Sequence, residues 1–359
     1  MLDTWFSSAL WPFATLGWPQ RTPELDRFYP GDVCSTGRDI NFLWVSRMIW
    51  AGIELMEDIP FSAVNYHAMI MAPDGRRMSK SLGTGIDPLE AVDKHGADAT
   101  RYGLLKITTM QDPRFNWGAI EEGAKLANKL WNAARLVLTQ AAGRVPDARP
   151  RLVEERWILS RLDETRELFE RSVAQFQFGA AVDALYHLTF DEFCDWYAEA
   201  IKPRLYDGDD DAAATALAAL ERLLALLHPV MPHVTEEIWA QFHETRLILG
   251  PWPGAAERDA DAVAVLERVR AAAAMFRRAG IAPPLDGEER RIFEAVVRPQ
   301  RARANGDVDA ERERLRAEIA RAEKMLANDS FVAKAPPHVV AETREKLERY
   351  RRELDSLGV

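Results

Sequence analysis

The sequence is poor in the residues that build disulfide-held or thiolate-metal folds. Among 359 residues there are two cysteines, Cys34 and Cys194, which are far apart and in no paired spacing. A disulfide framework and a cysteine zinc site are therefore both excluded. We expect no metal site held by the protein, and the free thiols fit a reducing compartment.

Long hydrophobic runs are also lacking. No apolar stretch approaches the roughly 20 residues of a membrane-spanning helix, and the amino-terminal residues lack the charged and apolar regions of a signal peptide. We therefore expect a soluble, cytoplasmic protein with no membrane partner.

Positive charge is in deficit, with 46 Lys and Arg against 56 Asp and Glu and a formal net charge of −10. This balance excludes an indiscriminate nucleic-acid coat but leaves room for local basic surfaces. The length is enough for two or three domains.

Residues 1 to 118 show the pattern of an α/β domain. The β-run "DVCSTG" is followed by the helical "INFLWVSRMIWAGIELM", and in such folds ligands bind at the carboxyl ends of the strands. Farther on, Asp87 is placed to cap a helix that begins at Pro88, and Glu90 is placed to complete a capping box.

From 119 to 255 the pattern predicts a helical bundle. Leu126, Leu130, Ala134 and Val137 recur at three- and four-residue steps, as on the buried face of a helix. The acidic "YDGDDDA" reads as a loop that faces away from any phosphate backbone. Residues 256 to 306 form a linker or helical connection with one helix near "AVAVLERVRAAAAMFRRAG".

Residues 307 to 359 predict an antiparallel coiled-coil hairpin. Two charged helical patterns are separated by "ANDSFVAKAPP", and each needs an apolar partner, which the other supplies. The seams comprise Leu315, Ile319, Ala322 and Leu326 in one arm, and Val340, Leu347, Tyr350, Leu354 and Leu357 in the other.

The stretch "PDGRRMSKSLGTG", residues 73 to 85, has the composition of a phosphate-binding loop. Arg77 and Lys80 are cations that would neutralise phosphoryl oxygens, Ser79 and Ser81 add hydroxyl donors, and the glycines allow close approach. On composition alone, a solvated turn with ordinary surface charge is the stronger alternative.

Within that stretch, "RMSKS" resembles the "KMSKS" signature of class I aminoacyl-tRNA synthetases, whose loop closes over ATP. The resemblance implies that Lys80 stabilises the α-phosphate transition state and the departing pyrophosphate, with Met78, Ser79 and Ser81 also at the ATP site. Arg77 stands where the family usually has lysine, which keeps the charge but changes its geometry. "LGT" departs from the more usual "KGN", so one polar contact of the family is not carried over to Thr84.

Further motifs resemble the valyl-tRNA synthetases, in that family's order. They are "LDTWFSSALWPF", "TGRDINFLWVSRM", "GADATRYGLL", "FDEFCDWYAEAIKPRLY", "LLHPVMPHVTEEIW" and "NDSFVAKAPPHVV". The resemblance implies the carboxy-terminal part of a Rossmann-like class I catalytic domain, an anticodon-binding helical bundle and a coiled-coil tRNA-binding arm.

The resemblance also assigns individual residues. Trp5, Ile40 and Trp44 match positions that enclose the valine side chain, and Gly37 and Asp39 match the pair that approaches the ATP ribose. The alternatives are that the tryptophans are core aromatics, and that "TGRD" is an ordinary strand-to-helix turn.

For tRNA, two groups of side chains are candidates. In the bundle, Trp196, Tyr197, Lys202 and Arg204 could contact RNA, but "FCDWY" fits a bundle core at least as well, so no anticodon contact is assigned. In the arm, a phosphate-facing edge would comprise Arg312, Arg314, Arg316, Arg321 and Lys324. An ordinary solvated coiled-coil face is equally compatible with them.

No histidine begins the second class I signature, "HIGH". The resemblance therefore implies a carboxy-terminal portion of a valine–tRNA ligase, without the first half of the nucleotide fold or the editing domain. Its substrates would be valine, ATP with Mg²⁺, and tRNA(Val), and a separate amino-terminal half is an expected partner. The alternatives are a non-catalytic tRNA-binding module and another branched-chain class I synthetase.

Overall fold

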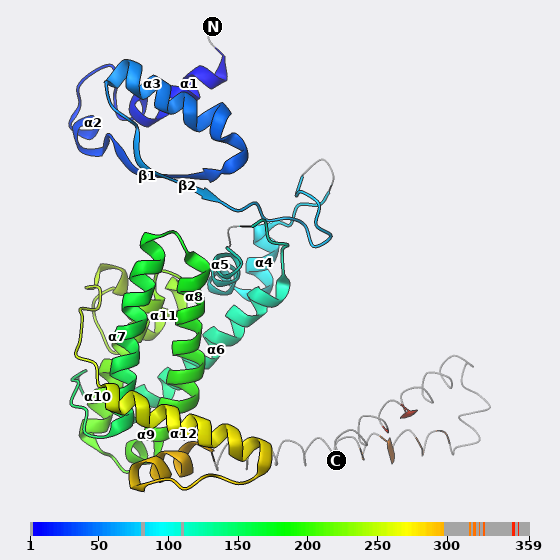
Figure 1. The fold of residues 1–359 in the computed structure, drawn as a ribbon, viewed down its shortest axis with the longest axis vertical. Helices are drawn as coiled ribbons and strands as arrows, with labels where there is room; N and C mark the ends of the chain where they lie inside the picture. The colour runs from blue at the N-terminus through cyan, green and yellow to red at the C-terminus, as the bar shows by residue number, and fades with distance from the viewer. Residues whose placement is uncertain are drawn as a thin grey trace. The chain divides into compact units, whose positions relative to one another are not determined.

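The computed structural model describes residues 3 to 79, 83 to 108 and 111 to 297, together with positions 316, 319, 320, 323, 326, 347, 348 and 351 (Figure 1). The chain divides into two compact units, residues 1 to 264 and 265 to 359. The boundary falls inside α12 (Ala260–Ala279). The division at residues 118, 255 and 306 stays a prediction.

The amino-terminal segment is an α/β arrangement built on two parallel strands. Its elements are α1 (Thr4–Ala14), α2 (Pro23–Phe28), β1 (Gly31–Gly37), α3 (Ser46–Met56) and β2 (Phe61–His67). Between β1 and α3 lie a 3₁₀ turn, Arg38–Ile40, and a π-helical turn, Asn41–Val45. The predicted strand-to-helix passage after "TG" is confirmed.

Helix α3 covers the strands and also packs on α1. Its Met48 is fully buried with Val45 against Cys34 of β1. Its Ala51 joins Ala9 and Phe13 of α1 in a separate cluster. The sheet register runs from Gly31 opposite Phe61 to Gly37 opposite His67, so the carboxyl ends of the two strands lie side by side.

The helix after the basic loop begins where the sequence predicts. Helix α4 spans Pro88–His95, and the Asp87 carboxylate accepts a hydrogen bond from the backbone N–H of Leu89 at 2.9 Å. The predicted capping box is wrong, because the Glu90 carboxylate instead accepts from Lys94, one turn farther on, at 2.6 Å. An (i, i+4) ion pair on the exposed face takes the side chain away from the helix start.

Helices α5 (Ala97–Lys106) and α6 (Trp117–Gln140) cross at close range because each has a glycine at the contact. A Cβ on Gly103 would lie 2.6 to 2.9 Å from atoms of Ile120, two of them backbone. A Cβ on Gly123 would lie 2.8 Å from the Tyr102 ring and 3.0 Å from the Ala99 backbone. The two helices therefore touch backbone to backbone.

Polar contacts join α5 to the turn before α11 (Pro232–Trp239). The buried Asp98 carboxylate accepts from the backbone N–H groups of His233 at 3.1 Å and Val234 at 2.6 Å, which caps α11. Arg101 donates to the carbonyls of Pro229 at 2.8 Å and Val230 at 3.2 Å. This segment of the "GADATRYGLL" motif thus binds the bundle directly.

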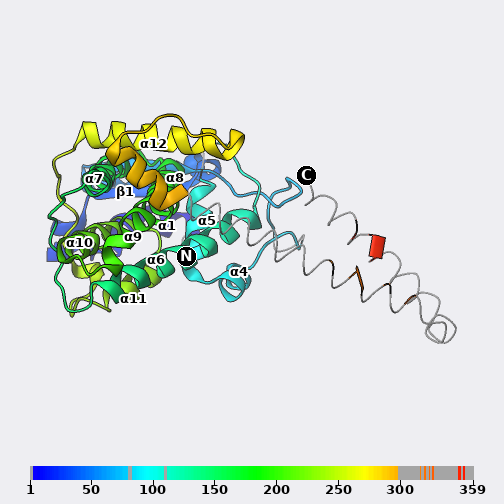
Figure 2. The same cartoon turned by 90° about the horizontal axis from the view of Figure 1, so that it is seen from below.

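The bundle is helical as predicted (Figure 2). Besides α6 and α11 it comprises α7 (Val153–Ala174), α8 (Phe178–Tyr186), the π-helix His187–Tyr197, α9 (Ala198–Tyr206), α10 (Asp210–Leu227) and a 3₁₀ turn, Leu247–Leu249. The stripe of Leu126, Leu130, Ala134 and Val137 is buried, which confirms the predicted face. Helix α10 is buried on nearly all sides, as its almost continuous apolar sequence requires.

The acidic loop before α10 is neutralised by arginines. Asp209 caps α10 by accepting from Asp211 N and Ala212 N, each at 3.1 Å. Arg204 of α9 donates to Asp209 and also reaches the fully buried Glu155 at 2.5 Å. These acids therefore stabilise a helix start, where the helix dipole favours negative charge.

The segment after the 3₁₀ turn runs along α7 and is held by charge. Asp163, buried in α7, accepts from the backbone N–H of Ala256 at 2.9 Å, from Arg258 Nε at 2.7 Å and from Arg166 Nε at 3.1 Å. The Trp252 indole donates to Glu170 at 2.7 Å. Sequence patterns gave this segment no role, because its anchors lie some 90 residues earlier in the chain.

The predicted helix near "AVAVLERVRAAAAMFRRAG" is confirmed as α12, which contains the boundary between the two units. A helix over 287 to 297, which the sequence did not indicate, packs on it through Phe276 and Phe293, whose ring centroids are 5.4 Å apart. Arg268 and Glu289 join the same two helices at 2.6 Å. Among the residues that the structure describes, no helix is both long and apolar enough to span a membrane.

The glycine contact between α5 and α6 predicts a specific intolerance. We expect Gly103→Ala to lower the free energy of unfolding by about 1 to 3 kcal/mol, because the new Cβ overlaps backbone that cannot give way locally. Urea unfolding followed by circular dichroism measures the change. Gly254→Ala is the matched control, since its Cβ would meet nothing within 4 Å. Equal effects of the two substitutions would contradict the packing argument.

Asp163 predicts a pH-dependent stability. Burial raises the pKa of its carboxyl group, but hydrogen bonds from Ala256 N, Arg258 and Arg166 outweigh burial and lower it overall. A lowered folded-state pKa gives stability that is present above the unfolded pKa of about 3.9 and is lost as pH falls through the folded pKa.

We therefore expect Asp163→Asn to cost about 2 to 3 kcal/mol at pH 7. The difference from the unmutated chain should shrink as urea titrations are repeated at pH values below about 4. A difference that is constant from pH 7 to pH 3 would show that the charge of Asp163 is not what stabilises the segment.

Candidate functional site

The carboxyl end of β1 carries the residues predicted to meet the ATP ribose. Gly37 ends the strand, and a Cβ there would lie 2.7 Å from Asp39 Oδ1 and 3.2 Å from Met69 Sδ. A side chain at position 37 would therefore displace Asp39. The carboxylate of Asp39 stays partly exposed at the strand end, where α/β folds bind their ligands.

The basic loop reaches back to this strand end. Arg77 Nη2 donates to Asp39 Oδ2 at 2.5 Å, across 38 residues of sequence. The hydrogen bond from Arg77 lowers the pKa of Asp39, against a smaller opposing effect of burial, with the charges of Arg77 and Arg38 adding to it. Two residues assigned to different parts of the ATP site are thus brought together.

A second acidic residue at this end, Asp112, was missed from sequence. It accepts from the backbone N–H of Met69 at 2.8 Å and pairs with Arg38. The Met69 hydrogen bond is the main cause that lowers its pKa, followed by the hydrogen bond from Arg38. A lone Asp in "QDPR" gives no periodic or motif signal, and its partners are distant in sequence, so no local pattern could have found it.

Hydrogen bonds of Thr84 join the two ends of the basic loop. Its hydroxyl accepts from Ser79 N at 3.0 Å and donates to the Arg77 carbonyl at 3.1 Å, while its own N–H donates to the Ser79 carbonyl at 3.3 Å. Met78 packs on the buried cluster that includes Ala91 and Phe115. The base of the loop is thereby attached to the core. Lys80 and Ser81 lie outside the described residues.

The residues predicted to enclose valine are brought near one another but remain open. Helix α1, which carries Trp5, packs beside the turn that carries Trp44. Trp5 is 40% exposed, with the Arg47 guanidinium 4.7 Å from its ring centre, and Ile40 is 38% exposed. Trp44 is half-buried against the Cys34 and Met48 cluster. The described residues thus leave two of the three pocket residues open to solvent.

For the bundle candidates the core interpretation is correct. Trp196 and Tyr197 are buried in the π-helix, and burial raises the pKa of Tyr197 well above its usual value. Lys202 pairs with Glu199 at 3.2 Å, and Arg204 is held by Glu155 and Asp209. Neither ring therefore offers a face on which a base could stack, since Trp196 is only 6% exposed and Tyr197 is fully buried.

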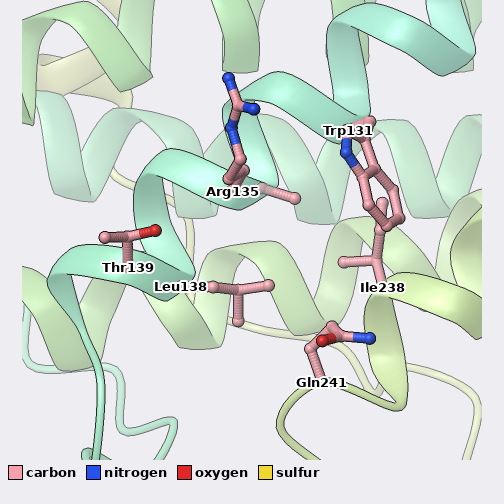
Figure 3. Close-up of a pocket in the computed structure, with 7 residues that line it drawn as sticks. Trp131, Arg135, Leu138, Thr139, Ile238 and Gln241 are labelled. Atoms are coloured by element: carbon pink, nitrogen blue, oxygen red, sulfur yellow. The ribbon is translucent and has the colours of Figure 1, made fainter.

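A pocket of about 320 Å³ lies instead between α6 and the end of α11 (Figure 3). Trp131 and Arg135 stand one turn apart on α6, with Leu138 beyond them, and Ile238 and Gln241 close the opposite side. The Trp131 side chain is 39% exposed. The pocket was not predicted from the sequence, although Trp131 and Arg135 lie at (i, i+4) spacing next to the buried stripe, which is a local signal for a shared helix face.

In the arm, Arg316 is exposed at a described position, while Arg312, Arg314, Arg321 and Lys324 lie outside the described residues. Leu347 is buried, and Ile319 and Leu326 are half-buried. The other predicted seam residues are also outside the described positions. Arg351 donates to Glu323 at 2.7 Å, which brings the two predicted helical segments together at one point.

No group of three or more His, Cys, Asp or Glu side chains among the described residues is arranged to hold a metal ion. At the end of β1, Asp39 and Asp112 each form an ion pair with an arginine instead. The site therefore has guanidinium groups that could meet phosphate and carboxylates that could accept from ribose hydroxyls. In this structure the two kinds of group pair with each other.

Three family models match the chain. The model described as tRNA synthetases class I (I, L, M and V) matches residues 1–116, the anticodon-binding domain of tRNA ligase matches residues 155–284, and the valyl tRNA synthetase tRNA binding arm matches residues 307–358. The order is that of the motifs quoted from the sequence.

Relatives of known name are valine–tRNA ligases. That of Carboxydothermus hydrogenoformans is 39% identical over 99% of this chain and 48% of its own length, and that of Bacillus subtilis is 35% identical over the same shares. The chain thus spans about half the length of these curated relatives.

Two solved structures share the fold. The Agrobacterium radiobacter K84 LeuRS–tRNA–LeuAMS complex has a TM-score of 0.60 at 22% identity, over 73% of this chain and 33% of that one. Mycobacterium tuberculosis methionyl-tRNA synthetase bound by methionyl-adenylate has a TM-score of 0.52 at 24% identity, over 62% and 46%. With three family models in order and valine–tRNA ligases aligned over almost all its length, the chain belongs to the valyl-tRNA synthetase family of class I aminoacyl-tRNA synthetases.

Proposed function

We propose that this chain supplies the ATP-closing loop, the anticodon-binding bundle and the tRNA-binding arm of a valine–tRNA ligase. The observation that carries the proposal is the contact of Arg77, the first residue of "RMSKS", with Asp39 at the carboxyl end of β1. The reaction would join a valine carboxylate oxygen to the α-phosphorus of ATP with release of pyrophosphate, and would then transfer valine to a hydroxyl of tRNA(Val) with release of AMP, in the cytoplasm.

Arg77 and Asp39 would exchange partners when ATP binds. The ribose hydroxyls would donate to Asp39, and the Arg77 guanidinium would turn to the phosphates, where charge develops as pyrophosphate leaves. Lys80, with Met78, Ser79 and Ser81 beside it, would act on the same phosphates. The related fold solved with methionyl-adenylate supports ATP as the substrate.

Mg²⁺ would arrive as part of the ATP complex. Among the described residues no three His, Cys, Asp or Glu side chains are arranged to hold the ion, and Asp39 would be engaged by the ribose. We therefore assign no step to the metal. Valine would rest against Trp5, Ile40 and Trp44, whose bulk suits a branched aliphatic group and excludes longer side chains by steric cost.

For tRNA, the pocket beside Trp131 is the best candidate for an unpaired base. An indole ring offers a stacking surface, Arg135 a phosphate or base-edge partner, and about 320 Å³ is ample for one base. The arm would add phosphate contacts along Arg312, Arg316 and Lys324. The Arg351–Glu323 contact and the buried Leu347 support an antiparallel hairpin there.

The proposed functional parts are residues 1 to 118, 119 to 255, 256 to 306 and 307 to 359. The leading alternative is a non-catalytic tRNA-binding module made of the bundle and the arm. A second is a synthetase for another branched amino acid, which competition by isoleucine or leucine in the exchange assay would reveal.

Valine-dependent exchange of pyrophosphate into ATP tests the catalytic proposal. We expect the isolated chain to be inactive and to gain activity when mixed with the amino-terminal half of the Carboxydothermus relative, which this chain does not match. In the mixture, Arg77→Ala should lower kcat by about 100-fold, because it removes a cation from the developing phosphate charge.

Arg76→Ala is the matched control for that loss. Arg76 neighbours Arg77 and is as exposed, but it pairs with Asp74 within the turn at 2.7 Å. Its removal should change the rate by less than threefold. Exchange by the isolated chain, or an equal loss in the two variants, would refute the assigned roles.

The base pocket predicts a loss of tRNA affinity. We expect Trp131→Ala to weaken binding of a tRNA(Val) transcript by about 5- to 150-fold, since stacking on an aromatic ring is worth about 1 to 3 kcal/mol per base. Filter binding at fixed salt measures it. Trp131→Ala should cost little with a transcript whose anticodon bases are replaced by abasic sites.

Arg135→Gln should also weaken binding, whereas Arg171→Gln should not. Arg171 lies on α7, is as exposed, and forms an (i, i+4) pair with Glu167 at 3.2 Å. A similar loss in both charge variants would indicate general electrostatic attraction and would reject a base site in this pocket.

A further inference from the structure

Two carboxylates and two arginines meet at the carboxyl end of β1. Arg77 pairs with Asp39, and Arg38 pairs with Asp112. The pKa of Asp39 is lowered chiefly by the hydrogen bond from Arg77, and the charge of Arg38 adds to the effect. The pKa of Asp112 is lowered chiefly by the N–H of Met69, and the charges of both arginines add to it. Each carboxylate therefore lies in the field of both guanidinium groups.

Asp112 is the fixed member of this cluster. Its carboxylate accepts from the backbone N–H of Met69 at 2.8 Å. The next residues pair with the segment that leads into the basic loop. Met71 N donates to the Pro113 carbonyl, and Phe115 N donates to the Met71 carbonyl, each at 2.8 Å. Because Phe115 is also buried, backbone contacts and packing together set where Asp112 stands.

The two arginines, by contrast, have long side chains that reach into solvent. The Arg38 side chain is 52% exposed and that of Arg77 is 65% exposed. Arg38 is the neighbour of Asp39 in the chain, yet its guanidinium pairs with Asp112, 74 residues away. An exposed guanidinium can change from one nearby carboxylate to another, because exposed ion pairs differ little in free energy. The observed pairing therefore depends on each arginine having its own carboxylate.

We infer that Asp112 and Arg38 are positioning residues, which occupy each other and so leave Asp39 and Arg77 to ATP. The inference deepens the proposed function and rests on it. Without the Asp112 carboxylate, Arg38 would turn to Asp39 and compete with the ribose hydroxyls. Without Arg38, the Asp112 carboxylate would attract Arg77 and hold it away from the phosphates.

The alternative is a simple structural tie, in which the Arg38–Asp112 pair only joins the end of β1 to the segment before the loop. The two interpretations differ in the effect of removing both partners. A broken tie is not repaired by deleting its second half. Competition ends when both competitors are gone, so the double variant should recover, which is a coupling that independent losses cannot produce.

Valine-dependent pyrophosphate exchange, in the mixture of this chain with the amino-terminal half of the Carboxydothermus relative, separates the two. The amide oxygen of D112N can still accept from Met69 N. We expect D112N to raise KM for ATP about 3- to 10-fold with little change in kcat, because Arg38 then competes for Asp39 in the ground state. R38A should lower kcat about 3- to 10-fold, because Arg77 acts where phosphate charge develops. R38A/D112N should return both constants to within about twofold of the unmutated values.

Glu90→Gln is the matched control. Glu90 pairs with Lys94 at 2.6 Å on the exposed face of α4, so the substitution removes one charge from another exposed ion pair. It should change neither constant by more than about twofold. A double variant that is as impaired as either single variant, or single variants that match the control, would overturn the inference.

A second measurement needs no catalysis. In crystals of the D112N chain grown without nucleotide, the Arg38 guanidinium should lie within about 4 Å of an Asp39 oxygen. In crystals of the R38A chain, Arg77 should lie within about 4 Å of Asp112. Arginines that keep their places or turn to solvent would overturn the inference. Exchanged partners in a chain whose mixture catalyses no exchange would leave the inference standing and would refute the proposed catalytic function.

Discussion

The close crossing of α5 and α6 is the contact on which the first unit depends. Because Gly103 and Gly123 have no side chains, α5 lies against the α6 backbone. Ala91 of α4 and Met78 at the base of the basic loop pack in the same cluster as Ile120 of α6. Asp98 and Arg101, also on α5, hold the turn before α11. One helix thus connects the loop that would meet ATP with the bundle that would meet tRNA.

Many arginines of this acidic chain form ion pairs with carboxylates of the same chain. Asp163 gathers Arg166 and Arg258, and Arg204 spans Glu155 and Asp209. These groups fix segments in place and are poorly placed to bind RNA. Nucleic-acid contacts are therefore expected from exposed positions such as Arg135 and Arg316, and the net charge of the chain does not decide the matter.

The features that the sequence predicts are those set by interactions between residues close together in the chain. The buried stripe beginning at Leu126 follows from helical periodicity, and the start of α4 follows from Asp87 and Pro88. The role of Asp112 did not follow, because its partners lie about 40 and 70 residues away. The anchoring of the 252 to 259 segment on Asp163 is long-range in the same way. Trp196 and Tyr197 showed helical spacing, but only packing could place them in the core.

The residues of the candidate site also differ in how far contacts within this chain fix their positions. Arg77, Met78 and Thr84 are fixed by contacts made inside this chain, so their positions follow from its own packing. Trp5 and Ile40, by contrast, are open to solvent. A pocket selects a branched aliphatic chain only when its walls are closed and dry, because solvent that enters restores the hydration that binding must remove. Under the proposed function, selectivity for valine would therefore depend on whatever covers these two residues, whereas the position of Arg77 follows from contacts made inside this chain.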